Sequence, residues 1–265
     1  MAVSTSGKRF VPFWIYVGIC VLVLAMHSLD TVLNIQRRPD DELPAVIEEV
    51  FRNHPAEVST SWVTHEVTRL RRFSGWFTLH TGPVVLWLAL SVTQMLPGFR
   101  RRNIERHKTL GLVMLITSAA MLLGVFALLV RGEEIYGTHF SLKQNPFTFS
   151  AWTVVGGAWW IYCAIQGYRF APDGSSHPSS SSKLQLHRRY MYHFLANGYS
   201  TGTARLLIFA YMLIKFPKNG KASIETEELD WLVDVMAWAS FVVNYAGAEI
   251  LIWAKNYGGK AEKTA

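Results

Sequence analysis

The sequence predicts an all-α fold, an integral membrane helical bundle of about six transmembrane helices. Of its 265 residues, 50% are hydrophobic and 17% are charged, which is a very apolar composition for a soluble domain of this size. The apolar residues also gather in runs of about 20, the length that a helix needs to cross a hydrocarbon core of about 30 Å. Because unpaired backbone groups cannot face lipid, and because long polar stretches are absent, we expect a single transmembrane domain over 1–265.

Six predicted spans follow one another along the chain. They cover residues 10–33, 74–96, 109–130, 149–170, 190–214 and 229–254. The first span could instead be a signal peptide, because Lys8 and Arg9 precede its apolar run and Ala25 ends an acceptable cleavage signal. Its apolar core is long for that role, which favours an uncut span.

Two segments between the spans have their own patterns. In 41–53, Asp41 can cap a helix whose apolar residues fall on one face, which predicts an amphipathic segment at the membrane surface or across the bundle. The stretch 174–182, GSSHPSSSS, predicts a flexible linker.

The orientation follows from the basic residues, because lysine and arginine resist translocation. They cluster after the second span, around the fourth linker and at the end of the chain, at Arg100, Arg101, Arg102, Arg106, Lys108, Arg169, Lys183, Arg188, Arg189, Lys255, Lys260 and Lys263. We therefore expect both termini on the inner, cytoplasmic-like side. The net charge of +7 is then explained by topology and by contact with membrane lipids, so that no nucleic-acid partner is expected.

Polar groups inside a bilayer are costly, so they usually face the bundle interior and indicate a site. Counting residues along each span predicts two layers of such groups. The outer layer contains His27, His80 and Arg205. The inner layer contains His107, His187, His193 and Glu249.

The fifth span carries a polar face. At 100° per residue, His193, Asn197, Ser200 and Ala204 lie on one side of a helix. Gly198 and Gly202 form a small-xxx-small pair, which predicts close packing of a neighbouring helix and offers a face for a membrane-protein partner.

Several of these residues carry a family resemblance. HTG at His80, Gln94 and the run RRRNIERHKTLG resemble the first half of an uncharacterised family of predicted membrane proteins, a domain of unknown function. The run HRRYMYH, followed by Arg205, resembles the family's later H-R-x-x-M-x-R segment. The matching residues are His80, Gln94, His107, Gly111, His187, Met191 and Arg205. His193 stands where the family has arginine, so that arginine's role does not carry over. The resemblance implies a helical membrane bundle and no established activity.

Histidines at matching depth on different helices suggest a haem b site and transmembrane electron transfer. Such a haem needs one imidazole from each of two helices and basic residues near its propionates. His107 and His187 are the favoured ligands of the haem iron, with His193 as a substitute and His80 and Arg205 as further cofactor-binding candidates. Arg101, Arg102, Arg106 and Arg188 are available for the propionates. The similarity to haem-b transmembrane cytochromes is limited to this general plan.

Two other readings remain open. In a proton-coupled carrier, His80, Arg205 and Glu249 would handle a proton or a small anion without a cofactor. A cofactor-free accessory subunit would use only its glycine-rich helix faces. The motifs of soluble hydrolases, kinases and nicotinamide enzymes are absent from the sequence, and whether the protein is an enzyme stays open.

Overall fold

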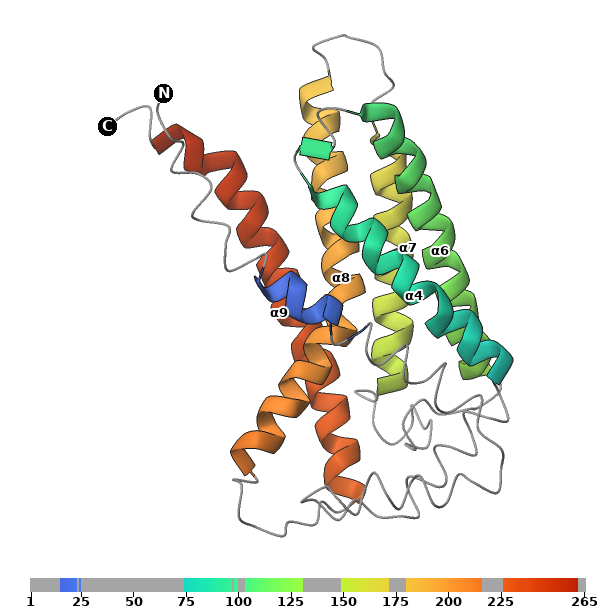
Figure 1. Ribbon diagram of the computed structural model, residues 1–265. Coiled ribbons are helices and arrows are strands. Elements are labelled where there is room, and N and C mark those ends of the chain that lie inside the picture. The colour runs from blue at the N-terminus through green and yellow to red at the C-terminus, as the bar shows by residue number, and fades with distance from the viewer. Residues whose placement is uncertain are drawn as a thin grey trace. The chain divides into compact units, whose positions relative to one another are not determined.

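The computed structural model describes an all-helical chain (Figure 1). The described residues are 15–22, 24, 74–96, 98–99, 103–130, 149–171, 180–215 and 226–261, and they contain no strand. The predicted all-α class is therefore confirmed for this part of the chain. The predicted segment 41–53 and most of the first span lie outside the described residues.

Five labelled helices follow the predicted spans. They are α4 Ser74–Met95, α6 Ile104–Val130, α7 Phe149–Arg169, α8 Ser180–Lys215 and α9 Thr226–Ala261. A further helix covers residues 15–22 and 24, in which Val17, Cys20 and Leu24 form a buried face. α6 and α8 begin earlier than predicted, because lysine, arginine and glutamine are good helix formers and extend each helix beyond its apolar run. α8 thus begins at Ser180, within the stretch predicted as a linker.

The chain divides into two compact units, which are described separately. Unit 1 contains Met1–Arg131 and Phe209–Glu225, and so includes α4, α6 and the last turns of α8. Unit 2 contains Gly132–Ile208 and Thr226–Ala265, and so includes α7, α9 and most of α8.

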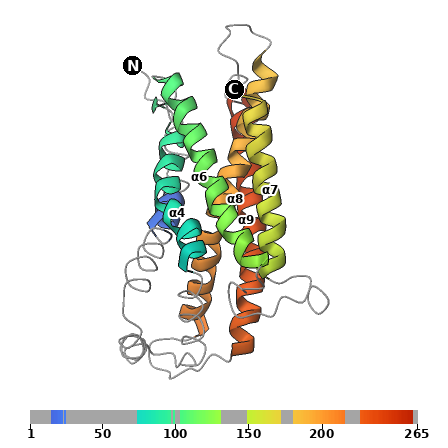
Figure 2. The same cartoon turned by 90° about the vertical axis from the view of Figure 1, so that its right-hand side faces the viewer.

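In unit 1, α4 and α6 pack side by side (Figure 2). His80 Nδ1 donates a hydrogen bond to the Met121 carbonyl oxygen at 3.1 Å, and Gln94 Nε2 donates to the His107 carbonyl oxygen at 3.0 Å. The two helices are therefore antiparallel. A Cβ atom at Gly124 would lie 2.8 Å from the backbone nitrogen of His80, so glycine permits this close crossing.

In unit 2, α7 and α8 are also antiparallel. Trp160 Nε1 donates to the Phe194 carbonyl oxygen at 2.8 Å, and the two rings stack with centroids 5.3 Å apart. One turn further along α8, Asn197 Nδ2 donates to the Gly156 carbonyl oxygen at 2.7 Å. These bonds satisfy polar groups that the apolar interior would otherwise leave unpaired.

α9 completes unit 2 by packing against α7 and α8. Trp152 of α7 lies in a buried cluster with Val233 and Ala237 of α9. Asn244 of α9 donates from Nδ2 to Thr203 Oγ1 of α8 at 2.8 Å. The core of unit 2 is therefore apolar on the α7 side and polar along the contact of α8 with α9.

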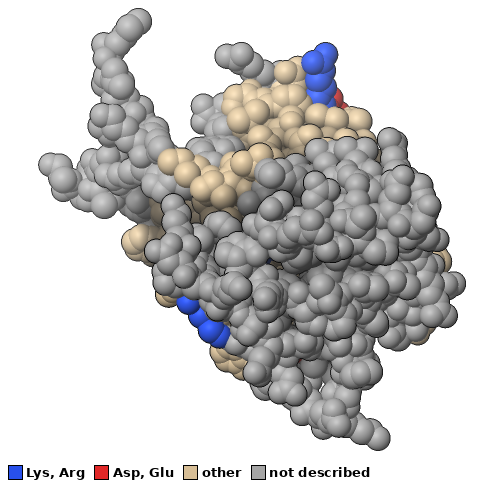
Figure 3. Space-filling view, turned by 60° about the horizontal axis from the view of Figure 1, so that its bottom comes forward, with Lys and Arg blue, Asp and Glu red and all other residues tan. Residues whose placement is uncertain are grey.

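Two described helices are long and apolar enough to cross a membrane, namely Ile104–Val130 and the Trp231–Ala254 portion of α9. Only 39% and 22% of the two apolar windows are buried. On the face in Figure 3, the described surface is mostly neither basic nor acidic.

Candidate functional site

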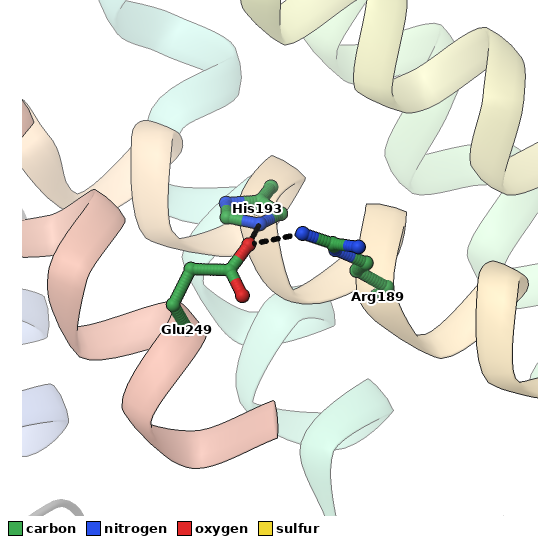
Figure 4. A network of polar contacts seen from close by, with 3 residues as sticks. All are labelled: Arg189, His193 and Glu249. Carbon is green, nitrogen blue, oxygen red and sulfur yellow. Dashed lines mark hydrogen bonds and ion pairs between the residues drawn. The ribbon is translucent and has the colours of Figure 1, made fainter. Parts of the chain in front are cut away.

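Three ionisable side chains meet at one carboxylate in unit 2 (Figure 4). Glu249 Oε1 of α9 accepts a hydrogen bond from His193 Nε2 at 2.8 Å and another from Arg189 Nη2 at 2.8 Å. We call these three residues the carboxylate network. Glu249 forms an ion pair with Arg189 at every ordinary pH. It also forms an ion pair with His193 when the imidazole is protonated.

Helix geometry positions each member of the carboxylate network. Arg189 and His193 are four residues apart on α8, so their side chains lie on one face, a single turn apart. Glu249 approaches from the neighbouring α9. Because one carboxylate oxygen has two lone pairs, it can accept both bonds at once.

Exposure falls steeply across the network. The side chain of Arg189 is 52% exposed and that of Glu249 33%, whereas that of His193 is only 4% exposed. Tyr245 stacks on the imidazole with ring centroids 4.6 Å apart, and Trp159 meets it edge-on at 5.9 Å. The network thus leads from an accessible guanidinium to an imidazole enclosed by aromatic rings.

The contact with Glu249 determines which nitrogen of His193 carries the proton. An ionised carboxylate can only accept, so Nε2 must bear the hydrogen in the neutral imidazole and Nδ1 must bear the lone pair. Nδ1 is buried and has no hydrogen-bond partner among the described residues. It is therefore the ring nitrogen of His193 that can accept a further proton.

The electrostatics of the network also act on Arg189. The hydrogen bond to Glu249 raises the pKa of the Arg189 guanidinium above its ordinary value. A raised pKa stabilises the fold below the unfolded value and loses this effect only as the pH rises through the folded value. Arg189 therefore stays charged throughout the neutral range, and changes of stability there arise from other groups.

The predicted residues His80 and His107 have separate places in unit 1. His80 bonds to Met121, which is fourteen residues beyond His107 on the same helix, or about 21 Å along its axis. This agrees with the two predicted layers. Gln94 contacts the backbone of His107 and approaches Gly111, so these matching residues also hold α4 against α6.

His187 lies at the crossing of α7 and α8. Its Nδ1 donates to the Gly167 carbonyl oxygen at 2.7 Å, and a Cβ atom at Gly167 would come within 2.6 Å of Met191 Sδ. His187 belongs to unit 2 and His107 to unit 1. The prediction that these two residues ligate one haem iron therefore has its support in the sequence alone.

The carrier reading grouped Glu249 with His80 and Arg205, and the structure gives Glu249 other partners. Arg205 is twelve residues from His193 on α8, about 18 Å along the axis, and its Nη1 lies 3.5 Å from the Thr201 carbonyl oxygen. His80 belongs to unit 1 and Glu249 to unit 2. His27, which the sequence places with His80 in the outer layer, lies outside the described residues.

Sequence reasoning placed His193 and Glu249 in one layer, which their contact supports, but it missed the other members of the site. Arg189 was assigned to topology alone, and Trp159 and Tyr245 were not singled out. The available signal was spacing, since Arg189 and His193 are separated by four residues, as are Tyr245 and Glu249.

Comparisons with protein-family models, with curated proteins and with solved structures found no match. Within the described residues, no group of three or more histidine, cysteine, aspartate or glutamate side chains is arranged to hold a metal ion. Both cysteines, Cys20 and Cys163, are buried. The carboxylate network is therefore the feature of the molecule from which a function is inferred.

Proposed function

We propose that this is a multi-pass membrane protein that moves protons through the His193–Glu249 pair, as a proton-coupled carrier does. The observation that carries the proposal is the 2.8 Å contact between a 4% exposed imidazole and a carboxylate on another helix. A buried histidine beside a carboxylate is a typical arrangement for moving a proton within a membrane.

Surface chemistry supports the membrane setting. A core helix of a soluble protein would be mostly buried, whereas the apolar windows of α6 and α9 are 39% and 22% buried. Large apolar side chains stay accessible on both helices, among them Leu112, Ile116, Leu123, Val130, Val242, Val243, Ile250 and Trp253. Soluble monomers rarely expose such continuous apolar surface, and lipid would cover it.

The transfer that we propose balances at each atom. One proton arrives at His193 Nδ1, and the proton on Nε2 passes to Glu249 Oε1, which changes the carboxylate to a carboxylic acid. The imidazole is left neutral with its hydrogen on Nδ1. Glu249 then releases its proton on the exposed side, where Arg189 favours the return of the negative charge. Rotation of the ring restores the first tautomer.

The experiment is proton uptake by proteoliposomes under an imposed potassium diffusion potential, followed with a trapped pH-sensitive dye. We expect uptake by the wild type and roughly tenfold slower uptake by Glu249→Gln and by His193→Gln. Glu105→Gln is the matched control, because Glu105 also pairs with a cation, Lys108, at 3.0 Å but is 79% exposed. Uptake by Glu249→Gln at the wild-type rate would contradict the proposal.

Haem b binding with electron transfer is the second candidate, favoured by the tautomers of two histidines. Because a carbonyl oxygen only accepts, the contacts with Gly167 and Met121 place the hydrogens of His187 and His80 on Nδ1. Each lone pair is then on Nε2, and a hydrogen bond from Nδ1–H to a backbone carbonyl is common in histidines that ligate a metal. His107 would supply the second ligand for His187, as the sequence suggests.

The oxidised and dithionite-reduced absorption spectra of detergent-purified protein test this candidate. A low-spin b-type spectrum that is weakened by His187→Ala or His107→Ala would support it. A colourless, folded protein from haem-replete cells would eliminate it and would leave the proton proposal untouched.

A further inference from the structure

Polar side chains continue beyond the carboxylate network along the contact of α8 with α9. On α8 they are Asn197, Ser200 and Thr203, of which Asn197 donates to the Gly156 carbonyl oxygen of α7, and on α9 they are Asn244, Ser240 and Asp234. We call these six residues the polar seam. All but Asn197, which is partly buried, are buried, with exposures of 8% or less.

The seam begins at His193 and continues at regular intervals. His193, Asn197, Ser200 and Thr203 are spaced by four, three and three residues, so they lie on one face of α8 and cover about 15 Å of its axis. Thr203 meets Asn244, from which Ser240 and Asp234 extend about another 15 Å along α9. On α9 the two steps together reach from Glu249 to Asp234, fifteen residues or about 22 Å, which is most of a hydrocarbon core of about 30 Å.

Hydrogen bonds join the two helices at both ends of the first step. At one end, His193 and Glu249 are 2.8 Å apart. At the other end, Asn244 Nδ2 donates to Thr203 Oγ1, while the Thr203 hydroxyl donates to the Tyr199 carbonyl oxygen at 3.2 Å. Thr203 thus both accepts and donates. A hydroxyl with both roles can pass a proton by rotating, which apolar side chains of the same shape cannot do.

The polar groups of this contact are bonded, since Ser240 and Asn244 each donate to a carbonyl oxygen of their own helix, at 2.7 and 2.8 Å. A buried polar group costs free energy unless it is bonded, and apolar residues of similar shape would pack here without that requirement. The seam also leads to the level of His193, whose Nδ1 is buried and has no hydrogen-bond partner among the described residues. A buried nitrogen without a hydrogen-bond partner indicates an atom that binds a proton or a donor only transiently.

We infer that the polar seam is the route by which protons reach His193 Nδ1 from the end of the span opposite Glu249. The inference rests on the proposed function. It assigns Thr203 and Asn244 to the step at which the route crosses from α9 to α8. A proton from water at the far end binds Asn244 Oδ1 while Nδ2 gives one hydrogen to Thr203 Oγ1, and Thr203 passes its own hydroxyl proton on toward Nδ1. Transfer of the proton from Oδ1 to Nδ2 then restores the amide, and the proton on Nε2 leaves to Glu249.

The test uses the full chain in proteoliposomes and the same uptake assay. Thr203→Val and Asn244→Leu remove polar groups at nearly constant shape, and we expect each to slow uptake roughly tenfold. Thr117→Val is the matched control, since Thr117 on α6 is also buried and also donates to a carbonyl four residues earlier, at 2.7 Å. Asn244→Ser keeps a polar group, leaves space for water and should conduct within a factor of about two.

Infrared spectroscopy of the carboxyl C=O stretch, recorded during a pH titration, separates the two proposals. The Glu249 signal, identified by its loss in Glu249→Gln, should persist in Thr203→Val and Asn244→Leu and should show that these variants are folded. Wild-type uptake rates in both variants would overturn the route and leave the proton function standing. Uptake by the wild type no faster than by protein-free vesicles, with no titrating Glu249 signal, would overturn both.

Discussion

Burial decides how much each partner of Glu249 contributes to stability. Arg189 and His193 lie at the same distance from Oε1, but Arg189 is half exposed and His193 is almost fully enclosed. Exposed ion pairs contribute little because water and salt screen them, whereas a buried charge-assisted hydrogen bond is screened less. Equal geometry therefore does not imply equal energy in this network.

Double-mutant cycles with Glu249→Gln should reveal this inequality. We expect a coupling of about 1–2 kcal/mol with His193→Gln and of less than about 1 kcal/mol with Arg189→Gln. The measurement is the free energy of unfolding in one detergent. The exposed pair of Glu105 and Lys108 provides the reference cycle, with an expected coupling of about 0.3–0.5 kcal/mol. A coupling with Arg189 that exceeds the coupling with His193 would contradict this account.

At this scale the sequence predicted part of the site. Counting residues along the spans placed His193 and Glu249 at one depth, because rise per residue is constant in a helix. It could not select Arg189 over other arginines, since basic residues near span ends have a topological explanation already. Nor could it predict that Tyr245 stacks on His193, because that contact depends on how α8 and α9 are rotated about their axes.

At the scale of helices, two glycines of α6 differ in how closely α4 approaches them. A Cβ atom at Gly124 would lie 2.8 Å from backbone atoms of His80 and Trp76, which cannot move without shifting the helix. A Cβ atom at Gly111 would meet only the Gln94 side chain, at 3.9 Å. The close crossing of α4 and α6 is therefore concentrated near Gly124.

Gly124→Ala should destabilise the protein relative to Gly111→Ala by about 1–3 kcal/mol. Both substitutions gain the same helix propensity, about 1 kcal/mol, so the difference between them isolates the steric effect. Thermal unfolding followed by circular dichroism in one detergent measures this difference. Equal midpoints for the two variants would show that α4 and α6 can separate at Gly124 without cost.

A third glycine provides an intermediate case. A Cβ atom at Gly167 would lie 2.6 Å from Met191 Sδ, but that atom is in a flexible side chain that can turn away. We expect Gly167→Ala to cost less than Gly124→Ala, and Met191→Ala to relieve most of that cost in the double variant. The same unfolding measurement applies. A cost for Gly167→Ala that survives Met191→Ala would mean that the backbone, not the methionine, limits the space.

Helix positions were more predictable than helix lengths. The ends of α4 and α7 lie one residue before the predicted ends at 96 and 170, because apolar runs determine where a spanning helix must lie. The start of α8 was not predictable from hydropathy, since a serine-rich stretch is typical of a linker and its last three residues are helical only in the context of the helix that follows.

At the scale of the whole molecule, the number of spans decides the topology. If all six predicted spans cross the membrane, the segment between α7 and α8 lies on the same side as the C-terminus. If only the two most apolar helices cross, 104–130 and 231–254, the chain between them stays on the opposite side. The basic residues Arg169, Lys183, Arg188 and Arg189 flank this segment and favour the first alternative.

Reporter fusions in bacterial cells distinguish these topologies, because green fluorescent protein fluoresces when it folds inside and alkaline phosphatase is active only outside. We expect fluorescence from fusions after residues 178 and 265, and phosphatase activity from a fusion after residue 140. The fusion at 140 is outside in both topologies and therefore controls for expression. The fusion at 178 is decisive. Phosphatase activity there would reduce the bundle to two spans and would remove α8, with His193 and most of the polar seam, from the membrane. The proton proposal requires that α8 crosses the bilayer beside α9, so this outcome would contradict it independently of any flux measurement.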